Sequence, residues 1–467
     1  MNDKKIIIFF ICHGFEAMTF LRTKLLEKLV RDNWDICIIS PNTDEDYFKN
    51  EFGKVARLES FHYVKSSLWI RLLVKFLSYS TYNLNNSIIL NLRWIKKKQY
   101  HPIKAILEKC TYRVAQLFRN KHKIVNSIFF PVPRQIKIFI DKLKTYQSVI
   151  LFSGTNSRNI TYYQLEKVFH EKRYFNIKYL IGWDNLYNKA QFFLEPDLLF
   201  VWSQTQKEQA TNIHRFSESK VKIVGSLNYE SKLDKSILIS KNAFYKDYHL
   251  DKNRKLIVYG TANNYIYDSN VELIEMLMNA IMHDQLIQKC QLLVRLHPQG
   301  QYKDKVTLYT DKQFSKYQEL DDKYPLLHFD IPEVMSDRLL FDVTREDFIH
   351  LTNIMFHSDI VINVASTISL DAAIFDKPVI NVAFDIPEKS YFDSCERCYE
   401  YDHYAQLIKT DGTSVVKSER ELIDTLNRYL KNPGLNSENR KRMIEQQIGA
   451  MTESASERIL EQLNSLL

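Results

Sequence analysis

Long apolar runs are missing from this chain of 467 residues. No segment approaches the roughly 18 uninterrupted apolar residues that a membrane-spanning helix requires. The first apolar run, Ile6 to Cys12, follows charged residues but is too short to span a membrane. It ends in the sequence HGFE rather than in the small residues of a signal-peptide cleavage site. We therefore interpret it as a first buried strand and expect a cytoplasmic protein.

Cysteine is also scarce, with six residues in the whole chain. Cys12 and Cys37 fall in apparent buried strands, so we expect reduced core thiols rather than a disulfide framework. Cys395 and Cys398 form a single CxxC without a second pair or a helical histidine partner, which argues against a zinc site. Internal repeats and low-complexity tracts are absent as well, which favours ordinary globular domains.

The sequence does contain the material for two domains of the α/β class. Its 45% hydrophobic residues suffice for two substantial cores, and its length favours more than one domain. Strand-like and helix-like segments alternate along most of the chain, which predicts parallel sheets. We predict a first domain over 1-230, a polar linker over 231-253 and a second domain over 254-467.

The clearest unit is the stretch from Asp359 to Asp385, DIVINVASTISLDAAIFDKPVINVAFD. It contains an apolar run, a small polar turn, an Ala-rich amphipathic segment and a second apolar run. Two buried strands joined by one short helix must be parallel, so the stretch predicts a βαβ unit.

The turn of this unit is a candidate phosphate site. Ser366 or Thr367 is expected at the helix N-terminus, where free N–H groups, the helix dipole and a hydroxyl converge at the carboxyl edge of the sheet. Asp371 lies about one turn inside the helix, from where a carboxylate reaches a ribose or sugar hydroxyl. The alternative is that Ser366 only caps the helix and that Asp371 is a solvated acid.

The first domain opens with a similar pattern. We predict a strand from Lys5 to Cys12, a helix from about Ala17 to Arg31 and a strand from Asp35 to Ser40. In the first loop, His13 is a candidate general base because an imidazole with a pKa of about 6.5 takes a hydroxyl proton near neutral pH. Glu16 is the competing candidate, and the alternative is that His13 only orders the loop.

Later strand ends carry further candidates. Asp184, in the sequence WDN, is placed to position or deprotonate an acceptor, although Asp-Asn is also ordinary turn chemistry. In the second half, the strand KLIVYG runs into a loop that begins with Thr261, and the strand CQLLVRL ends at a His-Pro pair. Arg295 and His297 point to one side of that strand end, where a cation and an imidazole suit a diphosphate.

Between Lys65 and Lys144 the pattern changes. This segment holds 17 Lys and Arg residues against two acids, Glu108 and Asp141, whereas the remainder of the chain is net negative. Aromatic and aliphatic residues, including Trp69, are interleaved with the charges, which predicts helices with an apolar and a cationic face. We expect the segment to dock on an anionic membrane surface. Nucleic-acid binding is not expected because no recognised module accompanies the charge, and the alternative is a set of solvated helices.

The motifs HGFE, WDN, GTAN, RLHP and the stretch 359–385 occur in an order that resembles bacterial glycosyltransferases of the GT-B fold. The chain is most similar to enzymes of surface-polysaccharide synthesis and to the CDP-glycerol, sialyl and Kdo transferases, which share a His-Pro and a Ser-containing turn. The resemblance covers most of both halves but not Lys65 to Lys144. It implies two Rossmann-like domains, with a nucleotide-sugar donor held by the second and the acceptor by the first. The segment that it does not cover is then interpreted as a basic, mainly helical insertion in the first domain.

This resemblance also assigns roles. His297, Ser366 and Thr367 would contact the donor phosphates, and Asp371 occupies the position where many such enzymes carry a Glu on the ribose. No DxD motif lies near a strand end, so we expect the leaving diphosphate to be stabilised by side chains and a helix dipole, without a metal or a cofactor. The expected donor-binding residues are Thr261, Arg295, His297, Ser366, Thr367 and Asp371, and the expected catalytic candidates are His13, Glu16 and Asp184.

The expected activity is sugar transfer from a nucleotide-activated donor to a glycan or lipid-linked acceptor in capsule or lipopolysaccharide synthesis. Three alternatives stay open. A CDP-glycerol-type enzyme would use the same His-Pro and Ser features to transfer a polyol phosphate, and a nucleotide-sugar 2-epimerase would need neither an acceptor nor a cationic insertion. The third alternative is a non-catalytic binding protein.

Overall fold

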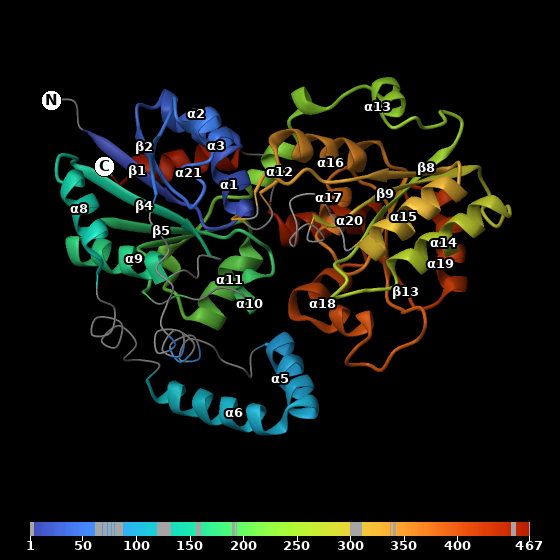
Figure 1. Ribbon diagram of the computed structural model, residues 1–467, viewed down its shortest axis with the longest axis horizontal. Helices are drawn as coiled ribbons and strands as arrows, with labels where there is room; N and C mark the ends of the chain where they lie inside the picture. The colour runs from blue at the N-terminus through green and yellow to red at the C-terminus, as the bar shows by residue number, and fades with distance from the viewer. Residues whose placement is uncertain are drawn as a thin grey trace. The chain divides into compact units, whose positions relative to one another are not determined.

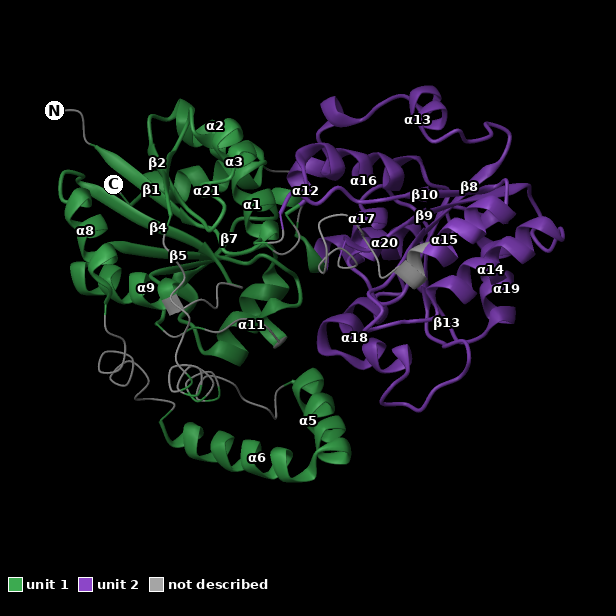
Figure 2. Cartoon of the chain, in the orientation of Figure 1, with its two compact units in different colours: residues 1–228, 338–342, 447–467 green, residues 229–337, 343–446 purple. Residues whose placement is uncertain are grey.

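The computed structural model describes most of the chain, which Figure 1 traces from end to end. The described residues are 4–60, 68, 72, 76, 79, 87–118, 132–155, 160–188, 192, 194–298, 311–336, 338–339, 342–449 and 454–466. They form two compact units (Figure 2): unit 1 comprises 1–228, 338–342 and 447–467, and unit 2 comprises 229–337 and 343–446. The predicted linker over 231-253 therefore lies in unit 2, and residues 447–467, predicted in the second domain, lie in unit 1.

Unit 1 is built on a seven-stranded sheet (Figure 1). All neighbouring strands are parallel. The chain starts in the interior of the sheet, runs to one edge and then continues on the other side of the first strand. From edge to edge the strands are β3 (Arg57–Glu59), β2 (Asp35–Ile39), β1 (Lys5–Phe10), β4 (Ser148–Gly154), β5 (Phe175–Tyr179), β6 (Leu198–Val201) and β7 (Val221–Ile223).

Helices of unit 1 bury their apolar sides against this sheet. Ile8 and Leu151, from β1 and β4, are fully buried in one cluster with Phe139 and Phe169 of two helices. Full burial of such side chains is worth roughly 1.5–3 kcal/mol each. The helices are α1 (Gly14–Leu21), α2 (Lys24–Arg31), α3 (Asp46–Phe52), α5 (Ile88–Tyr100), α6 (Pro102–Leu117), α8 (Arg134–Leu143), α9 (Ile160–Lys172), α10 (Asn185–Asn188), α11 (Gln204–His214) and α21 (Ala455–Asn464).

The helix predicted from Ala17 to Arg31 is two helices, so that prediction is wrong in detail. The break falls at Arg22, the C-cap of α1, and Thr23 then begins α2 as its N-cap. The buried Arg22 guanidinium donates to Glu51 at 2.8 and 2.9 Å and to Asp342 at 2.6 Å. Satisfying a buried cation from two distant segments explains why the chain turns here.

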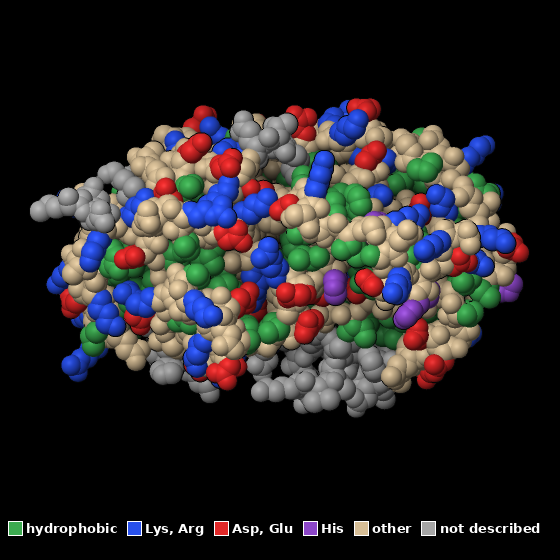
Figure 3. Space-filling model, turned by 90° about the horizontal axis from the view of Figure 1, so that it is seen from above, with side chains coloured by type: hydrophobic (Ala, Val, Ile, Leu, Met, Phe, Trp, Pro, Cys, Tyr) green, Lys and Arg blue, Asp and Glu red, His purple; other side chains and the backbone are tan. Residues whose placement is uncertain are grey.

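The basic segment from Lys65 to Lys144 is described only in part. Its described residues include α5, α6 and α8, which agrees with the expected helical insertion, whereas Trp69 lies outside the described residues. In the part of the chain that the structure describes, no helix is long and apolar enough to cross a bilayer. On the face of the molecule seen in Figure 3, basic and acidic side chains are interspersed.

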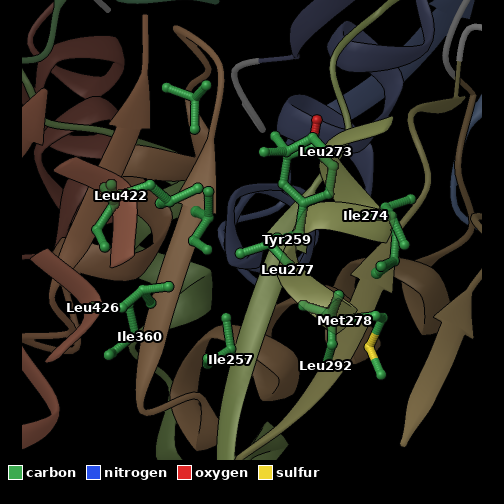
Figure 4. Packing of buried hydrophobic residues seen from close by; sticks show 14 of the residues in the cluster. Ile257, Tyr259, Leu273, Ile274, Leu277, Met278, Leu292, Ile360, Leu422 and Leu426 are labelled. Atoms are coloured by element: carbon green, nitrogen blue, oxygen red, sulfur yellow. The ribbon is translucent and has the colours of Figure 1, made fainter. Parts of the chain in front are cut away.

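Unit 2 is built on a six-stranded parallel sheet. Its strands, in spatial order, are β10 (Leu327–Asp330), β9 (Cys290–Arg295), β8 (Lys255–Gly260), β11 (Ile360–Asn363), β12 (Val379–Val382) and β13 (Ser414–Val416). Its helices are α12 (Leu227–Lys232, which begins at the end of unit 1), α13 (Lys241–Asp247), α14 (Asn270–Met282), α15 (Asp311–Lys323), α16 (Arg345–His357), α17 (Ile368–Ala373), α18 (Asp402–Ile408), α19 (Glu419–Lys431) and α20 (Ser437–Gln447). Figure 4 shows Ile257, Tyr259 and Ile360 of the strands packed with Leu273 of α14 and Leu422 of α19.

The βαβ unit predicted from Asp359 to Asp385 is confirmed. β11 and β12 are parallel, with Val361 opposite Val379, and α17 connects them. Gly260, the last residue of the neighbouring strand β8, permits the close approach of α17. A Cβ at Gly260 would lie 2.3 Å from Cδ1 of Ile368. The first residue of α17 therefore packs directly on the end of β8.

Candidate functional site

Three neighbouring strands of unit 2 end at the same edge. Arg295 of β9 is opposite Gly260 of β8, which is opposite Asn363 of β11. The residues that follow these strands therefore gather at one place. Strand order also reverses here, since β9 and β10 lie on one side of β8 and β11 to β13 lie on the other. Such a switch point is where open α/β sheets bind ligands.

Thr261 and His297 are joined at this edge. The N–H of His297 donates to Oγ1 of Thr261 at 2.9 Å, and the N–H of Thr261 donates to the carbonyl of Arg295 at 3.0 Å. Burial, and secondly the charge of Arg295, lowers the pKa of His297 to about 4. The imidazole is therefore neutral at pH 7, and it interacts with an anion as a hydrogen-bonding group rather than as a cation.

The Ser366 turn joins β11 to α17 at the same edge. Ala365 adopts a left-handed backbone conformation, with φ 43°. The N–H of Ser366 donates to Oδ1 of Asn363 at 2.9 Å, and Oγ of Ser366 accepts from the N–H of Ile368 at 3.3 Å. Thr367 is the N-cap residue of α17, and its exposed side chain makes no capping bond. Ser366 is thus the residue that caps the helix, and the Thr367 hydroxyl lies at the surface.

A network of buried polar side chains, which we did not predict from the sequence, supports this turn on the side of the protein interior. Tyr404 donates to Oδ1 of Asn381 at 2.8 Å and to the carbonyl of Ser366 at 3.2 Å. Ser369 lies 2.9 Å from the Tyr404 hydroxyl and 3.1 Å from Oδ1 of Asn381, and Asn363 donates to it at 3.0 Å. The sequence does indicate this network, because Asn363 and Asn381 each lie near the end of an otherwise apolar strand, and a buried polar side chain needs hydrogen-bond partners.

Arg295 is bound within the protein. Its guanidinium forms ion pairs with Asp330 of β10 and, at 2.6 Å, with Asp347 of α16, and all three side chains are buried. Burial works against the charged form, but the two carboxylates outweigh it and raise the pKa of Arg295. Tyr248 adds a hydrogen bond to Asp330 at 2.8 Å. The structure thus shows Arg295 joining the end of β9 to two neighbouring elements.

Asp371 is buried and is also paired. Its Oδ1 lies 2.6 Å from Nζ of Lys232, and both side chains are less than a tenth exposed. Burial, followed by the charge of Asp371 and a hydrogen bond to it, raises the pKa of Tyr229 well above its ordinary value. The Lys232 ammonium also lies 5.5 Å from the centre of the Phe348 ring. The carboxylate in α17 therefore has a counter-ion from α12.

Unit 1 has a corresponding edge between β1 and β4. Glu16 is fully buried there, and its Oε2 accepts the N–H of Cys12 at 2.9 Å. A Cβ at Gly154 would lie 2.3 Å from Oε1 of Glu16, so the carboxylate fills the space between the two strand ends. His13 is the N-cap of α1, where its Nδ1 accepts from the N–H of Phe15 at 3.4 Å.

Asp184 lies at the neighbouring strand end. Asn185 donates to Oδ1 of Asp184 at 3.2 Å and accepts at 3.0 Å from the hydroxyl of Thr155, the residue that follows β4. Because a Cβ at Gly154 would contact Glu16 and Thr155 contacts Asn185, Glu16 and Asp184 lie beyond the ends of β1 and β5, the two strands that flank β4. The structure thus gathers all three catalytic candidates at one edge of the unit 1 sheet.

Lys178 of β5 is a buried charge that the sequence analysis overlooked. Its Nζ is fully buried, 3.7 Å from Oε1 of Glu166 and 4.5 Å from the centre of the Tyr162 ring. Burial lowers the pKa of Lys178, and the charges of Glu166 and then Glu16 oppose that shift. Electrostatics therefore couple the carboxylate at the sheet edge to this buried pair.

Among the described residues, no group of three or more His, Cys, Asp or Glu side chains is placed to hold a metal ion. The Cys395 and Cys398 thiols are both buried, and neither forms a disulfide bond. Burial, aided by Asp385, raises the pKa of Cys395 above its ordinary value.

No protein-family model and no curated protein matches the chain. Among solved structures, UDP-GlcNAc 2-epimerase from Neisseria meningitidis bound to UDP-GlcNAc is 12% identical, with a TM-score of 0.53 over 99% of this chain and 100% of that one. A glycosyltransferase from Rickettsia africae is 11% identical, with a TM-score of 0.53 over 100% and 99%. The wall teichoic acid polymerase TagF is 11% identical, with a TM-score of 0.50 over 100% and 89%. The chain thus has a GT-B-like fold, an arrangement of two Rossmann-like units that it shares with these enzymes.

Proposed function

We propose that the protein is a nucleotide-sugar-dependent glycosyltransferase that builds bacterial surface polysaccharide, such as capsule or lipopolysaccharide. The observation that carries the proposal is the edge of unit 2, where Thr261, His297 and the Ser366 turn follow three adjacent strands at a topological switch point. Hydroxyl, imidazole and backbone N–H groups are donors that suit a diphosphate.

In this proposal the donor lies on unit 2 and its diphosphate is the leaving group. His297, Ser366 and Thr367 bind the phosphate oxygens and stabilise the charge that develops on them. Arg295 positions His297, because both of its carboxylate partners hold the end of β9 in place. Asp371 is the ribose ligand, with Lys232 as its counter-ion. Neither a metal nor a further cofactor enters this scheme.

The acceptor hydroxyl loses its proton to a group of unit 1. His13 is the base we propose, because an imidazole takes a proton near neutral pH and the residue lies in the loop after β1. Glu16 is the alternative base, and Asp184 positions the acceptor. In this scheme the deprotonated acceptor oxygen attacks the anomeric carbon, and the bond from that carbon to the nucleotide's phosphate oxygen breaks.

We further propose a glycan or lipid-linked acceptor and a peripheral location at the inner face of the membrane. The support is the excess of 17 basic over two acidic residues from Lys65 to Lys144. Cations near an anionic bilayer contribute about 1 kcal/mol each. Nucleic acid is not a proposed partner.

Product analysis tests the proposal. The protein is incubated with UDP-, GDP-, CMP- and CDP-activated donors, with and without a lipid-linked acceptor, and free nucleotide and sugar products are quantified. Nucleotide release that requires the acceptor supports transfer. A changed sugar configuration with donor alone indicates a 2-epimerase, transfer from CDP-glycerol indicates a polyol-phosphate transferase, and no turnover with any donor favours a binding protein.

A further inference from the structure

Helix α6 carries an exposed apolar stripe. Its members recur at helical spacing and, at 100° per residue, fall within a sector about 100° wide. Soluble proteins rarely leave such a continuous apolar surface uncovered unless it binds something. The stripe consists of Ile103, 74% exposed, Ile106, 58%, Leu107, 62%, Val114, 49%, and Leu117, 78%, together with the exposed Cys110.

The opposite side of α6 is the side that packs. Ala105 and Ala115 are fully buried there. The carbonyl of Ala105 accepts from Nε1 of Trp94 in α5 at 3.3 Å, and Gln116 donates to the carbonyl of Tyr79 at 2.6 Å. These contacts join α6 to α5 and to Tyr79 through the side opposite the stripe.

Cations flank the stripe on both sides. Lys104 lies on one side of it, and Lys109 and Arg113 lie on the other, as helical spacing requires. Residues 87–118 contain seven Lys and Arg residues and a single acid, Glu108, which forms an ion pair with Lys97. This one-sided charge contrasts with the mixed charges on the face in Figure 3.

We propose that α6 lies in the interface of an anionic lipid bilayer, with the apolar stripe among the acyl chains and the flanking cations at the level of the lipid phosphates. An aliphatic stripe between two rows of cations is the pattern of an interfacial helix. A second copy of the chain is a less suitable partner for the stripe, because it would bring two strongly basic pairs of helices, α5 and α6 of each copy, together. The inference rests on the peripheral membrane location in the proposed function and names the helix that makes the contact; it does not depend on sugar transfer, since docking itself needs no turnover.

The test uses the full chain and vesicles of phosphatidylcholine with 0 to about 40% phosphatidylglycerol, a range in which each cation contributes about 1 kcal/mol. One variant replaces Ile103, Leu107 and Leu117 with Gln, which keeps the helix propensity high. A second replaces Lys104, Lys109 and Arg113 with Gln. The matched control replaces Ile223, Ile287 and Ile331 with Gln; these are also exposed, at 40%, 57% and 41%, and lie outside the basic segment.

We expect the parent and the control to sediment with anionic vesicles at low salt. The charge variant should lose about a hundredfold in partition coefficient, at about fivefold per cation, and the stripe variant about tenfold or more. Circular dichroism and thermal unfolding check that the variants are folded. Nucleotide-induced thermal shifts should stay as in the parent, so failure of docking is distinguishable from failure of the proposed function.

Four results would overturn the inference. A stripe variant that binds vesicles like the parent would show that charge alone attracts the protein and that no insertion occurs. Equal binding to neutral and anionic vesicles would remove the role of the flanking cations, and binding to neither would remove the lipid partner. A parent dimer in light scattering that dissociates in the stripe variant, without vesicle binding, would assign the stripe to a second copy of the chain.

Discussion

The two sheets have the same strand order around their first strand, yet their switch points carry opposite chemistry. In unit 1 a buried carboxylate, Glu16, fills the space between β1 and β4. In unit 2 the ends of β9, β8 and β11 instead carry imidazole, hydroxyl and amide groups, and Ile368 packs on the end of β8. The nearby carboxylate of unit 2, Asp371, is paired with Lys232.

The difference indicates how one architecture separates two tasks. A buried carboxylate repels a diphosphate but suits a sugar hydroxyl or a proton in transit, whereas neutral donors suit the diphosphate. In the proposed function, unit 1 would therefore supply the base and the acceptor site, and unit 2 the nucleotide site. Variants at the two edges should accordingly affect different kinetic constants.

Substitutions at the edge of the unit 1 sheet should have the largest effect on the turnover rate. His13→Ala should lower kcat by about 10²–10⁴ with little change in donor affinity, because it removes the proton acceptor. Glu16→Gln should have a smaller effect. Steady-state kinetics with saturating donor measure both, and unchanged unfolding temperatures serve as the control. The reverse ranking would transfer the role to Glu16, and two near-normal variants would favour Asp184.

Arg295→Met should cause the largest loss of stability in unit 2. It leaves Asp330 and Asp347 as buried carboxylates without a cation, which costs about 3–5 kcal/mol. Arg254→Met is the matched control, because its pair with Asp251 at 3.3 Å is partly exposed and is worth at most about 1 kcal/mol. Urea denaturation compares the two. Equal losses would show that Arg295 is not held by its carboxylates and is available to a ligand.

Replacing the residues proposed to bind phosphate in unit 2 should lower the affinity for the nucleotide donor rather than the turnover rate at saturating donor. Ser366→Ala combined with Thr367→Ala should weaken nucleotide-diphosphate affinity roughly ten- to hundredfold for each hydroxyl lost, since each bond to a charged phosphate is worth about 1.5–3 kcal/mol. His297→Ala should act similarly. Calorimetric titration measures the affinities, and Ser390→Ala, an exposed serine of the same unit, is the control. Parent-like affinity in the folded variants would refute the phosphate assignment.

A smaller effect concerns the pH dependence of stability in unit 2. The pKa of His297 is lowered to about 4, below the ordinary value of about 6.5, so the unfolded chain takes up its proton first as the pH falls. The stability that depends on the neutral ring is complete above about pH 6.5 and is lost as the pH falls toward 4. Denaturation between pH 4.5 and 7 should show a shallower slope for His297→Gln, and an unchanged slope would contradict the shift.

Much of the architecture was predictable because it depends on local patterns. Buried apolar runs separated by amphipathic helices gave the parallel sheets, and the stretch from Asp359 to Asp385 gave a βαβ unit with the correct order of elements. The place of His297 and the Ser366 turn at one edge followed from the rule that parallel strands end together.

The partners of the charged residues were not predictable in the same way. Asp330 and Asp347 lie 35 and 52 residues from Arg295, and no spacing in the sequence shows that the fold brings them into contact. The break at Arg22 has the same cause, since Asp342 is 320 residues away. Long-range ion pairs therefore changed the interpretation of single residues while leaving the positions of the strand ends intact.

Hydrogen exchange of the full chain, with and without a nucleotide, tests the central claim most directly. A thermal-shift panel of UDP, GDP, CMP, CDP and dTDP first selects the ligand, since a ligand at 100 times its dissociation constant adds about 2.7 kcal/mol of stability. With the nucleotide bound, we expect slower exchange of the backbone amides at 261–264, 296–298 and 364–370, the loops and the turn that follow β8, β9 and β11. Protection at 12–16 and 154–155 of unit 1 instead, or at neither edge despite a thermal shift, would contradict the central claim.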